Sequence, residues 1–112
     1  FLSKFKTMPQ INQLDIHDTQ TKIGDGDINI VDIRDPASFT IGHIENAVHL
    51  SDTNVQEFIE KTNKDLPLIV YCYHGNSSQG AAAYFQEQGF KEVYSMAGGF
   101  EAWKYKYPFK TE

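Results

Sequence analysis

The centre of this 112-residue chain reads Leu68-Ile69-Val70-Tyr71-Cys72-Tyr73-His74-Gly75-Asn76-Ser77-Ser78, and this stretch decides the fold. Its first four residues are apolar, β-branched or aromatic, which is typical of a buried parallel strand. The segment 78–88, rich in Gly and Ala, favours a helix that ends at Gly89. The stretch therefore predicts a strand, a loop and a helix in that order, with Cys72 at the junction.

Cys72 is the only cysteine of the chain. Unpaired backbone N–H groups and the helix dipole stabilise an anion at a helix start. They can lower the pKa of a thiol from about 8.5 toward neutrality, which makes Cys72 a candidate nucleophile. The alternative is a small buried core residue, because free cysteine is among the most buried residue types.

The composition indicates one domain with a single hydrophobic core. A net charge of −5 argues against nucleic acid or an anionic membrane as the main partner, since both reward clustered Lys and Arg. No apolar stretch approaches the roughly 20 residues of a membrane span. A single cysteine excludes an intramolecular disulfide and a cysteine-based zinc site. A free thiol is typical of a reducing compartment, so we expect a cytoplasmic protein.

Strand and helix patterns alternate along the chain. Strand patterns occupy 28–33, 43–50, 68–71 and 92–95. Helix patterns follow Asp15, Asp35 and Ser51-Asp52-Thr53-Asn54, and two more cover 78–88 and 100–107. This alternation favours an α/β fold with a parallel sheet covered on both faces and with ligands at the carboxyl ends of its strands, where Cys72 lies.

Three motifs resemble those of the rhodanese family. The first is Phe39-Thr40-Ile41-Gly42-His43-Ile44-Glu45-Asn46-Ala47-Val48-His49-Leu50, which is similar to the amino-terminal signature and is preceded by a fitting Asp32-Ile33-Arg34-Asp35-Pro36. Met96-Ala97-Gly98-Gly99-Phe100-Glu101-Ala102-Trp103 resembles the carboxyl-terminal signature. The segment from Cys72 to Ser77 fills the place of the six-residue active-site loop.

The resemblance implies a single rhodanese domain, 1–112, with its core at about 12–107 and a parallel five-stranded sheet with helices on both faces. It also implies a thiosulfate sulfurtransferase that works in two steps without a cofactor. Cys72 would take the outer sulfur of thiosulfate, release sulfite and hold a persulfide. The acceptor would be cyanide or a thiol, including that of a thioredoxin-like protein. His17 and His49 are too scattered for a metal site, and none is expected.

The resemblance makes the six residues after Cys72 the anion-binding loop: Tyr73, His74, Gly75, Asn76, Ser77 and Ser78. The backbone N–H groups of 73–77 would form a cradle for the thiolate and the persulfide. Gly75 permits the backbone angles of a tight loop, and Ser77 and Ser78 can donate hydrogen bonds or cap the helix.

One departure from the family concerns charge. Many rhodaneses carry Arg or Lys in this loop, but here neither occurs between Cys72 and Gly80. Hydrogen bonds without a charged partner have about half the strength of charge-assisted ones. We therefore predict a poor apparent affinity for thiosulfate, and another persulfide can be the physiological donor.

Several residues have two interpretations. His74 is either a base or anion donor, or a residue that shapes the loop or faces solvent, and the second is favoured. His43 could pair with Cys72, but the family pattern favours a histidine that ties a loop by hydrogen bonds. Asp32 and Arg34 similarly favour an anchoring ion pair over a catalytic pair.

The aromatic residues of the carboxyl-terminal segment also have two interpretations. Phe100, Trp103 and Tyr107 recur at helical spacing, which favours core packing over a docking surface. Tyr73 and Phe109 can line the rim of the active site or contact a partner.

Three other functions compete. A Cys-x5-Arg phosphatase needs arginine at position 78, where the chain has Ser78. A persulfide carrier or sensor domain would use the same Cys72 with a protein partner. An inactive structural module usually lacks the cysteine.

Overall fold

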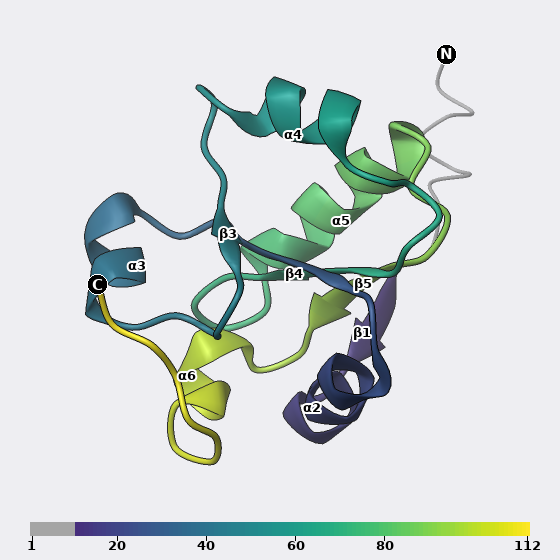
Figure 1. Ribbon diagram of the computed structural model, residues 1–112. Helices are drawn as coiled ribbons and strands as arrows, with labels where there is room; N and C mark the ends of the chain where they lie inside the picture. The colour runs from purple at the N-terminus through teal and green to yellow at the C-terminus, as the bar shows by residue number, and fades with distance from the viewer. Residues whose placement is uncertain (1–10) are drawn as a thin grey trace.

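The structure, a computed structural model, describes residues 11–112, which form one twisted five-stranded sheet (Figure 1). Its strands are β1 (Asn12–Leu14), β2 (Asn29–Asp32), β3 (Val48–His49), β4 (Leu68–Tyr71) and β5 (Val93–Met96). They lie in the order β1-β5-β4-β2-β3, and every neighbouring pair is parallel. The carboxyl ends of all five strands therefore meet at one edge of the sheet.

Helices cover both faces of the sheet. They are α2 (Ile16–Asp25), α3 (Pro36–Ile41), α4 (Val55–Lys61), α5 (Ser77–Glu87) and α6 (Gly99–Trp103). Figure 1 shows α4 and α5 on one face and α2 and α6 on the other. The α/β fold with a parallel five-stranded sheet is confirmed. Within residues 11–112 no helix has the length and apolar character needed to cross a membrane.

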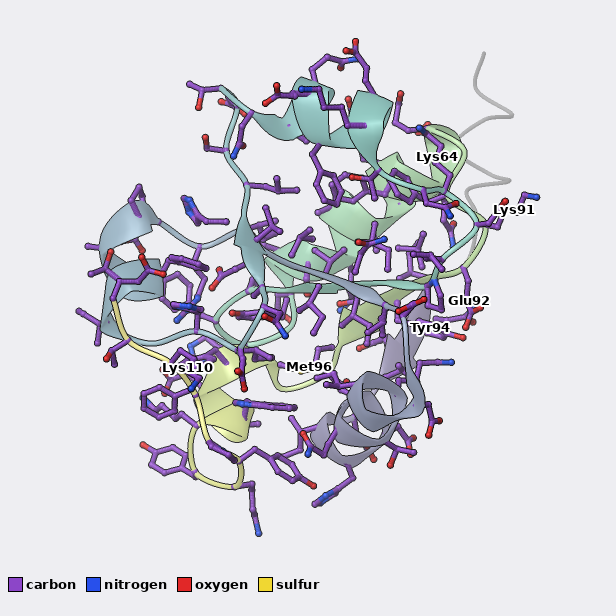
Figure 2. All side chains as sticks on the ribbon, in the orientation of Figure 1. Lys64, Lys91, Glu92, Tyr94, Met96 and Lys110 are labelled. Atoms are coloured by element: carbon purple, nitrogen blue, oxygen red, sulfur yellow. The ribbon has the colours of Figure 1, made fainter. Side chains whose placement is uncertain are left out.

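The central strand β4 contributes residues to both hydrophobic clusters of the core, one on each face of the sheet. All four of its residues are buried, and they alternate between the two faces of the sheet. Leu68 and Val70 join the cluster under α4 and α5, whereas Ile69 and Tyr71 join the cluster under α2 and α6. Met96, labelled in Figure 2, belongs to the second cluster. The junction after β4 therefore rests on the most enclosed part of the fold.

Local capping accounts for where two helices begin. The Asp15 carboxylate accepts a hydrogen bond of 2.7 Å from the Asp18 amide at the start of α2. Asp35 does the same for Ser38 at the start of α3, where Pro36 occupies the first helical position. Both helix starts follow the prediction from sequence.

Two predicted boundaries are wrong. The strand expected over 43–50 is reduced to Val48–His49, because a turn in which the Ala47 amide donates to Ile44 at 3.0 Å interrupts it. The helix expected over 100–107 ends at Trp103, since hydrogen bonds from 106 and 107 both return to the Trp103 carbonyl in tight turns. The residue patterns also missed β1, whose three residues are too few to show a period.

A buried ion pair lies at the carboxyl end of β2. Arg34 donates from Nη2 to Asp32 Oδ2 at 2.7 Å and to the Gly42 carbonyl at 2.5 Å. The Asp32 side chain is fully buried and that of Arg34 is 4% exposed. The pair joins β2 to the end of α3, which agrees with an anchoring role for these residues.

We expect Asp32→Ala to lower the free energy of unfolding by about 3–5 kcal/mol, because it leaves the buried Arg34 guanidinium without its counter-charge. Urea denaturation measures this loss. The control is Glu57→Ala, which removes one half of the exposed Glu57–Lys61 pair and should cost less than about 1 kcal/mol. Equal losses in the two variants would contradict an anchoring role.

Candidate active site

Cys72 directly follows β4, and the next residues turn into α5. The backbone amides of Gly75 and Ser78 each donate to Cys72 Sγ at 3.3 Å. Cys72 is 5% exposed. Sulfur at this distance from two N–H groups is placed to carry negative charge, because donors that already point at it need no reorganisation when it ionises.

A pair of buried serine hydroxyls lies behind the sulfur. Ser78 Oγ is 3.4 Å from Cys72 Sγ and 2.7 Å from Ser95 Oγ on β5. Both serines are fully buried. The Cys72 thiol donates to Ser78, and once the sulfur is ionised the Ser78 hydroxyl can become the donor. Sequence reasoning missed Ser95, because one small polar residue in a strand gives no local signal of its contact with the loop.

The pKa of Cys72 reflects a competition between burial and hydrogen bonding. Burial raises the pKa of the thiol. The Ser78 hydroxyl and the backbone amides of Ser78, Gly75 and His74 lower it, and together they prevail, so the pKa lies below its ordinary value. The loop therefore favours the thiolate without a charged partner.

The loop lies directly on the backbone of the carboxyl-terminal signature. Gly75 has a φ of 94°, and a Cβ there would lie 2.9 Å from the Gly98 nitrogen. A Cβ on Gly99 would lie 2.4 Å from the Tyr73 oxygen. The Phe100 amide then donates to the Cys72 carbonyl at 2.9 Å. The two motifs are thus parts of one site, and no side chain fits between them.

The remaining loop side chains point elsewhere. Tyr73, His74, Asn76 and Ser77 are exposed, and none forms a hydrogen bond with Cys72 Sγ. Asn76 precedes α5 without a side-chain capping bond. Of the six predicted loop residues, the structure brings Gly75 and Ser78 to the sulfur, and His74 contributes through its amide.

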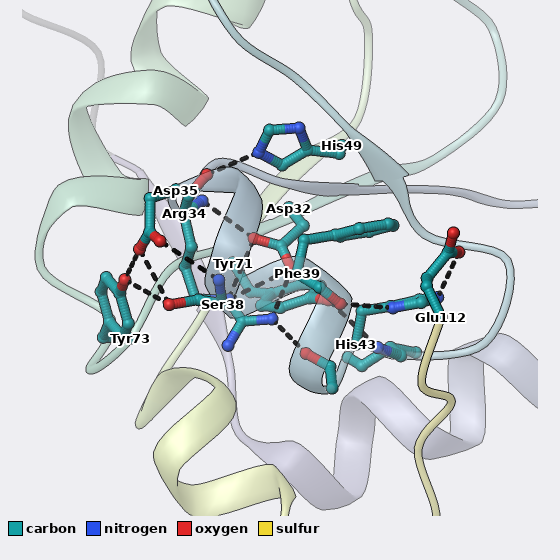
Figure 3. Close-up of polar contacts among 12 residues, drawn as sticks. Asp32, Arg34, Asp35, Ser38, Phe39, His43, His49, Tyr71, Tyr73 and Glu112 are labelled. Carbon is teal, nitrogen blue, oxygen red and sulfur yellow. Dashed lines mark hydrogen bonds and ion pairs between the residues drawn. The ribbon is translucent and has the colours of Figure 1, made fainter.

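The Tyr73 side chain joins the loop to the start of α3 (Figure 3). Its hydroxyl donates to the Asp35 carboxylate and lies 2.7 Å from Ser38 Oγ. Ser38 Oγ also donates to Asp35 at 2.8 Å. This contact connects the active-site loop with the segment that follows β2, and the two interpretations of Tyr73, at the rim of the site or in contact with a partner, stay predictions.

His43 lies outside the loop. Its Nδ1 is 2.8 Å from the Phe39 carbonyl, and its ring stacks on the Phe39 ring with centroids 3.9 Å apart (Figure 3). Nε2 faces the Glu112 carboxylate at 3.6 Å. These contacts agree with a histidine that ties a loop. Among residues 11–112 no group of three potential metal ligands gathers.

Comparison with known proteins identifies the family. The model of the rhodanese-like domain matches residues 15–106. The chain belongs to the rhodanese-like family. Two curated relatives are each named thiosulfate sulfurtransferase GlpE. That of Pseudomonas putida is 46% identical over 98% of this chain and 94% of its own, and that of Pseudomonas aeruginosa is 56% identical over 73% of this chain and 74% of its own.

Solved structures share the fold. A rhodanese-like domain protein from Staphylococcus aureus superposes with a TM-score of 0.78 at 19% identity, covering 91% of this chain and 99% of its own. A protein from Rhodopseudomonas palustris, described as a possible tyrosine phosphatase, has a TM-score of 0.75 at 29% identity and covers 89% of this chain and 85% of its own. A rhodanese-like fold therefore occurs in proteins described in different ways, and the residues of the loop must distinguish the chemistry.

We expect Ser78→Ala to raise the pKa of Cys72, because it removes the hydroxyl that lowers it. A thiol with a higher pKa is less ionised at neutral pH, so alkylation by iodoacetamide near pH 7 should slow by about threefold to tenfold. The rate is measured against pH. The control is Ser51→Ala, at an exposed serine, which should leave the dependence of the alkylation rate on pH unchanged. An unchanged midpoint in Ser78→Ala would refute this role.

We expect Gly75→Ala to destabilise the protein by at least about 2 kcal/mol, since its positive φ and the Gly98 backbone both exclude a Cβ. Gly80→Ala is the matched control. Nothing lies within 4 Å of a Cβ at Gly80, and its place inside α5 predicts a gain of about 0.5–1 kcal/mol. Thermal or urea unfolding compares the two variants. Effects of the same sign would contradict the packing of the loop.

Proposed function

We propose that this chain, a thiosulfate sulfurtransferase of the rhodanese-like family, carries its sulfur as a persulfide on Cys72. The observation that carries the proposal is the convergence of the Gly75 and Ser78 amides on Cys72 Sγ at 3.3 Å. The names of the relatives support the activity, and the hydrogen bonds support the assignment of the nucleophile.

The first half-reaction is a displacement at sulfur. The Cys72 thiolate attacks the outer sulfur of thiosulfate, a new S–S bond forms, and the S–S bond of thiosulfate breaks to release sulfite. The persulfide keeps the single negative charge that the thiolate had. The charge moves outward by one sulfur, and we propose that the backbone N–H groups of 73–77 and the Ser77 and Ser78 hydroxyls remain available to it.

The second half-reaction restores the enzyme. A cyanide ion or a thiolate attacks the outer sulfur, and the bond between the two sulfurs breaks. Thiocyanate or an acceptor persulfide leaves, and the Cys72 thiolate is regenerated. We propose thiols, including those of a thioredoxin-like protein, as the acceptors. The one cysteine of the chain is unpaired, which is typical of a reducing compartment such as the cytoplasm, where thiols are abundant. No cofactor takes part in either step.

The loop argues against phosphatase chemistry. A Cys-x5-Arg enzyme holds the phosphoryl oxygens with a bidentate guanidinium. The corresponding position is Ser78, which is fully buried and bonded to Ser95. Cleavage of p-nitrophenyl phosphate should therefore be negligible.

A persulfide carrier acting with a protein partner remains the alternative, and it is favoured by one observation. The loop side chains provide no cation, so thiosulfate should bind weakly, with a Michaelis constant above the low micromolar range. Slow turnover with thiosulfate and cyanide, together with fast loading from a protein persulfide, would favour the carrier.

The decisive test is intact-protein mass spectrometry after brief treatment with thiosulfate. We expect the wild type to gain one sulfur atom and to lose it again after cyanide, while Cys72→Ser gains nothing. The variant is nearly isosteric, so circular dichroism should show an unchanged fold. A sulfur atom retained by Cys72→Ser, or no gain in a folded wild type from thiosulfate or a protein persulfide, would refute the proposal.

A further inference from the structure

A pocket lies beside the active-site loop, between α3 and α6. Its volume is about 210 Å³, and its lining includes Arg34, Ser38, Tyr73, Phe100, Lys104 and Phe109. Tyr73 is the residue next to the nucleophile in the chain. Neither Cys72 nor the residues 74–78 contribute to the lining, so the pocket adjoins the anion cradle without being part of it.

The buried wall of this pocket carries the only arginine of the chain, Arg34. Its Nε and Nη2 are occupied by Asp32 and by the Gly42 carbonyl. Nη1 has no hydrogen-bond partner among residues 11–112, and Figure 3 shows one guanidinium nitrogen of Arg34 without a dashed line. Nη1 is not fully enclosed, although the Arg34 side chain as a whole is only 4% exposed.

The orientation of the ion pair favours an anion in this pocket. Asp32 binds one edge of the guanidinium, so the positive end of the pair lies toward the free edge. The central carbon of the guanidinium also lies 4.3 Å from the centre of the Phe100 ring, a cation–π contact that helps to hold it in place. A planar donor that is held in place and mostly removed from water loses little entropy when it binds an oxygen.

Lys104 supplies the second cation. It belongs to the lining, as does Glu101, with which it pairs at 3.0 Å in a half-exposed contact that an incoming carboxylate can exchange. The other acidic group nearby is Asp35, whose carboxylate accepts from Ser38 and Tyr73. The Ser38 hydroxyl and the Ser38 amide hold the pKa of Asp35 below its usual range, so its carboxylate stays ionised and bound to these donors.

We propose that this pocket binds the carboxylate of an extended thiol acceptor, with one oxygen on Arg34 Nη1 and the other near Lys104. The inference rests on the proposed function and names the class of acceptor. Cys72 does not line this pocket and Tyr73, its neighbour in the chain, does, so an anion held here has to be extended enough to reach past Tyr73 to the persulfide. The bound thiolate attacks the outer sulfur of the persulfide, and the acceptor leaves as its own persulfide while the Cys72 thiolate returns.

The kinetic test compares ω-mercapto carboxylates with mercapto alcohols of equal length, for example 3-mercaptopropionate, 6-mercaptohexanoate and 6-mercaptohexanol. Persulfide-loaded enzyme is mixed with each thiol at a pH where the two thiols of a pair are equally ionised. We expect a carboxylate of suitable length to react faster than its alcohol, and Lys104→Glu to reduce this preference by about fivefold. Lys61→Glu is the control, because it makes the same change in net charge at an exposed Glu–Lys pair outside this pocket.

A second readout needs no activity. Since Arg34 is the only arginine, its side-chain NMR signals are assigned without ambiguity. We expect hexanoate, which has no thiol, to shift these signals, and hexanol to leave them in place. Hexanoate should also compete with 6-mercaptohexanoate in the kinetic test.

The outcomes separate this proposal from the proposed function. If thiosulfate loads Cys72 and cyanide unloads it, but carboxylates and alcohols react alike and hexanoate leaves Arg34 unchanged, the pocket assignment is overturned and the sulfurtransferase stands. If Lys104→Glu slows loading by thiosulfate and spares the acceptor step, the pocket serves the donor and the assignment is again overturned. If no persulfide forms, the proposed function itself fails.

Discussion

The close approach of two backbones holds the site together. The loop after β4 and the turn before α6 meet where Gly75 faces Gly98 and where Gly99 faces the Tyr73 carbonyl, at distances that exclude any Cβ. Because this contact is made by main chain, its geometry does not depend on side-chain rotamers. The direction of the loop amides toward Cys72 follows from it, and so does the hydrogen bond from Phe100 to the Cys72 carbonyl. The contact that packs the loop against α6 therefore also sets the geometry around Cys72.

Among residues 11–112, neutral dipoles and not a neighbouring cation stabilise Cys72, the proposed nucleophile. Burial opposes ionisation of Cys72, and the Ser78 hydroxyl and the loop amides overcome it. Such donors are fixed by the fold and lose no side-chain entropy when the sulfur ionises, in contrast to an exposed lysine. The cost is sensitivity to small displacements, since the contribution of both amides, at 3.3 Å from the sulfur, depends on the position of the loop backbone. The support of the loop by β4 and α6 keeps these donors in position around the sulfur.

Sequence reasoning was most reliable where one local signal was enough. The four residues before Cys72 gave β4 with its observed bounds, and Asp15 and Asp35 gave two helix starts. It failed where a contact between distant segments decides the outcome. The hydroxyl pair of Ser78 and Ser95 joins residues 17 positions apart on different elements. The end of α6 and the turn within 43–50 depend on local turn hydrogen bonds, which leave no periodic pattern in the sequence. The predicted single domain, 1–112, and the roles of the individual loop residues stay predictions.

The distribution of positive charge has a consequence for the reaction as a whole. The Cys72 thiolate and its persulfide each carry one negative charge, and a cradle of neutral donors suits both equally. Thiosulfate and sulfite carry two, so the same cradle binds them less well than a guanidinium would. Weak binding of sulfite favours its departure, and this in turn limits reversal of the first half-reaction. Asp32 holds the single arginine, Arg34, outside the cradle, so Arg34 does not strengthen the binding of sulfite there. In our proposal, Arg34 instead binds an acceptor that approaches past Tyr73. In the mechanism that we propose, separation of the cradle from the cation thus lets one site release a dianion and still attract an anionic acceptor.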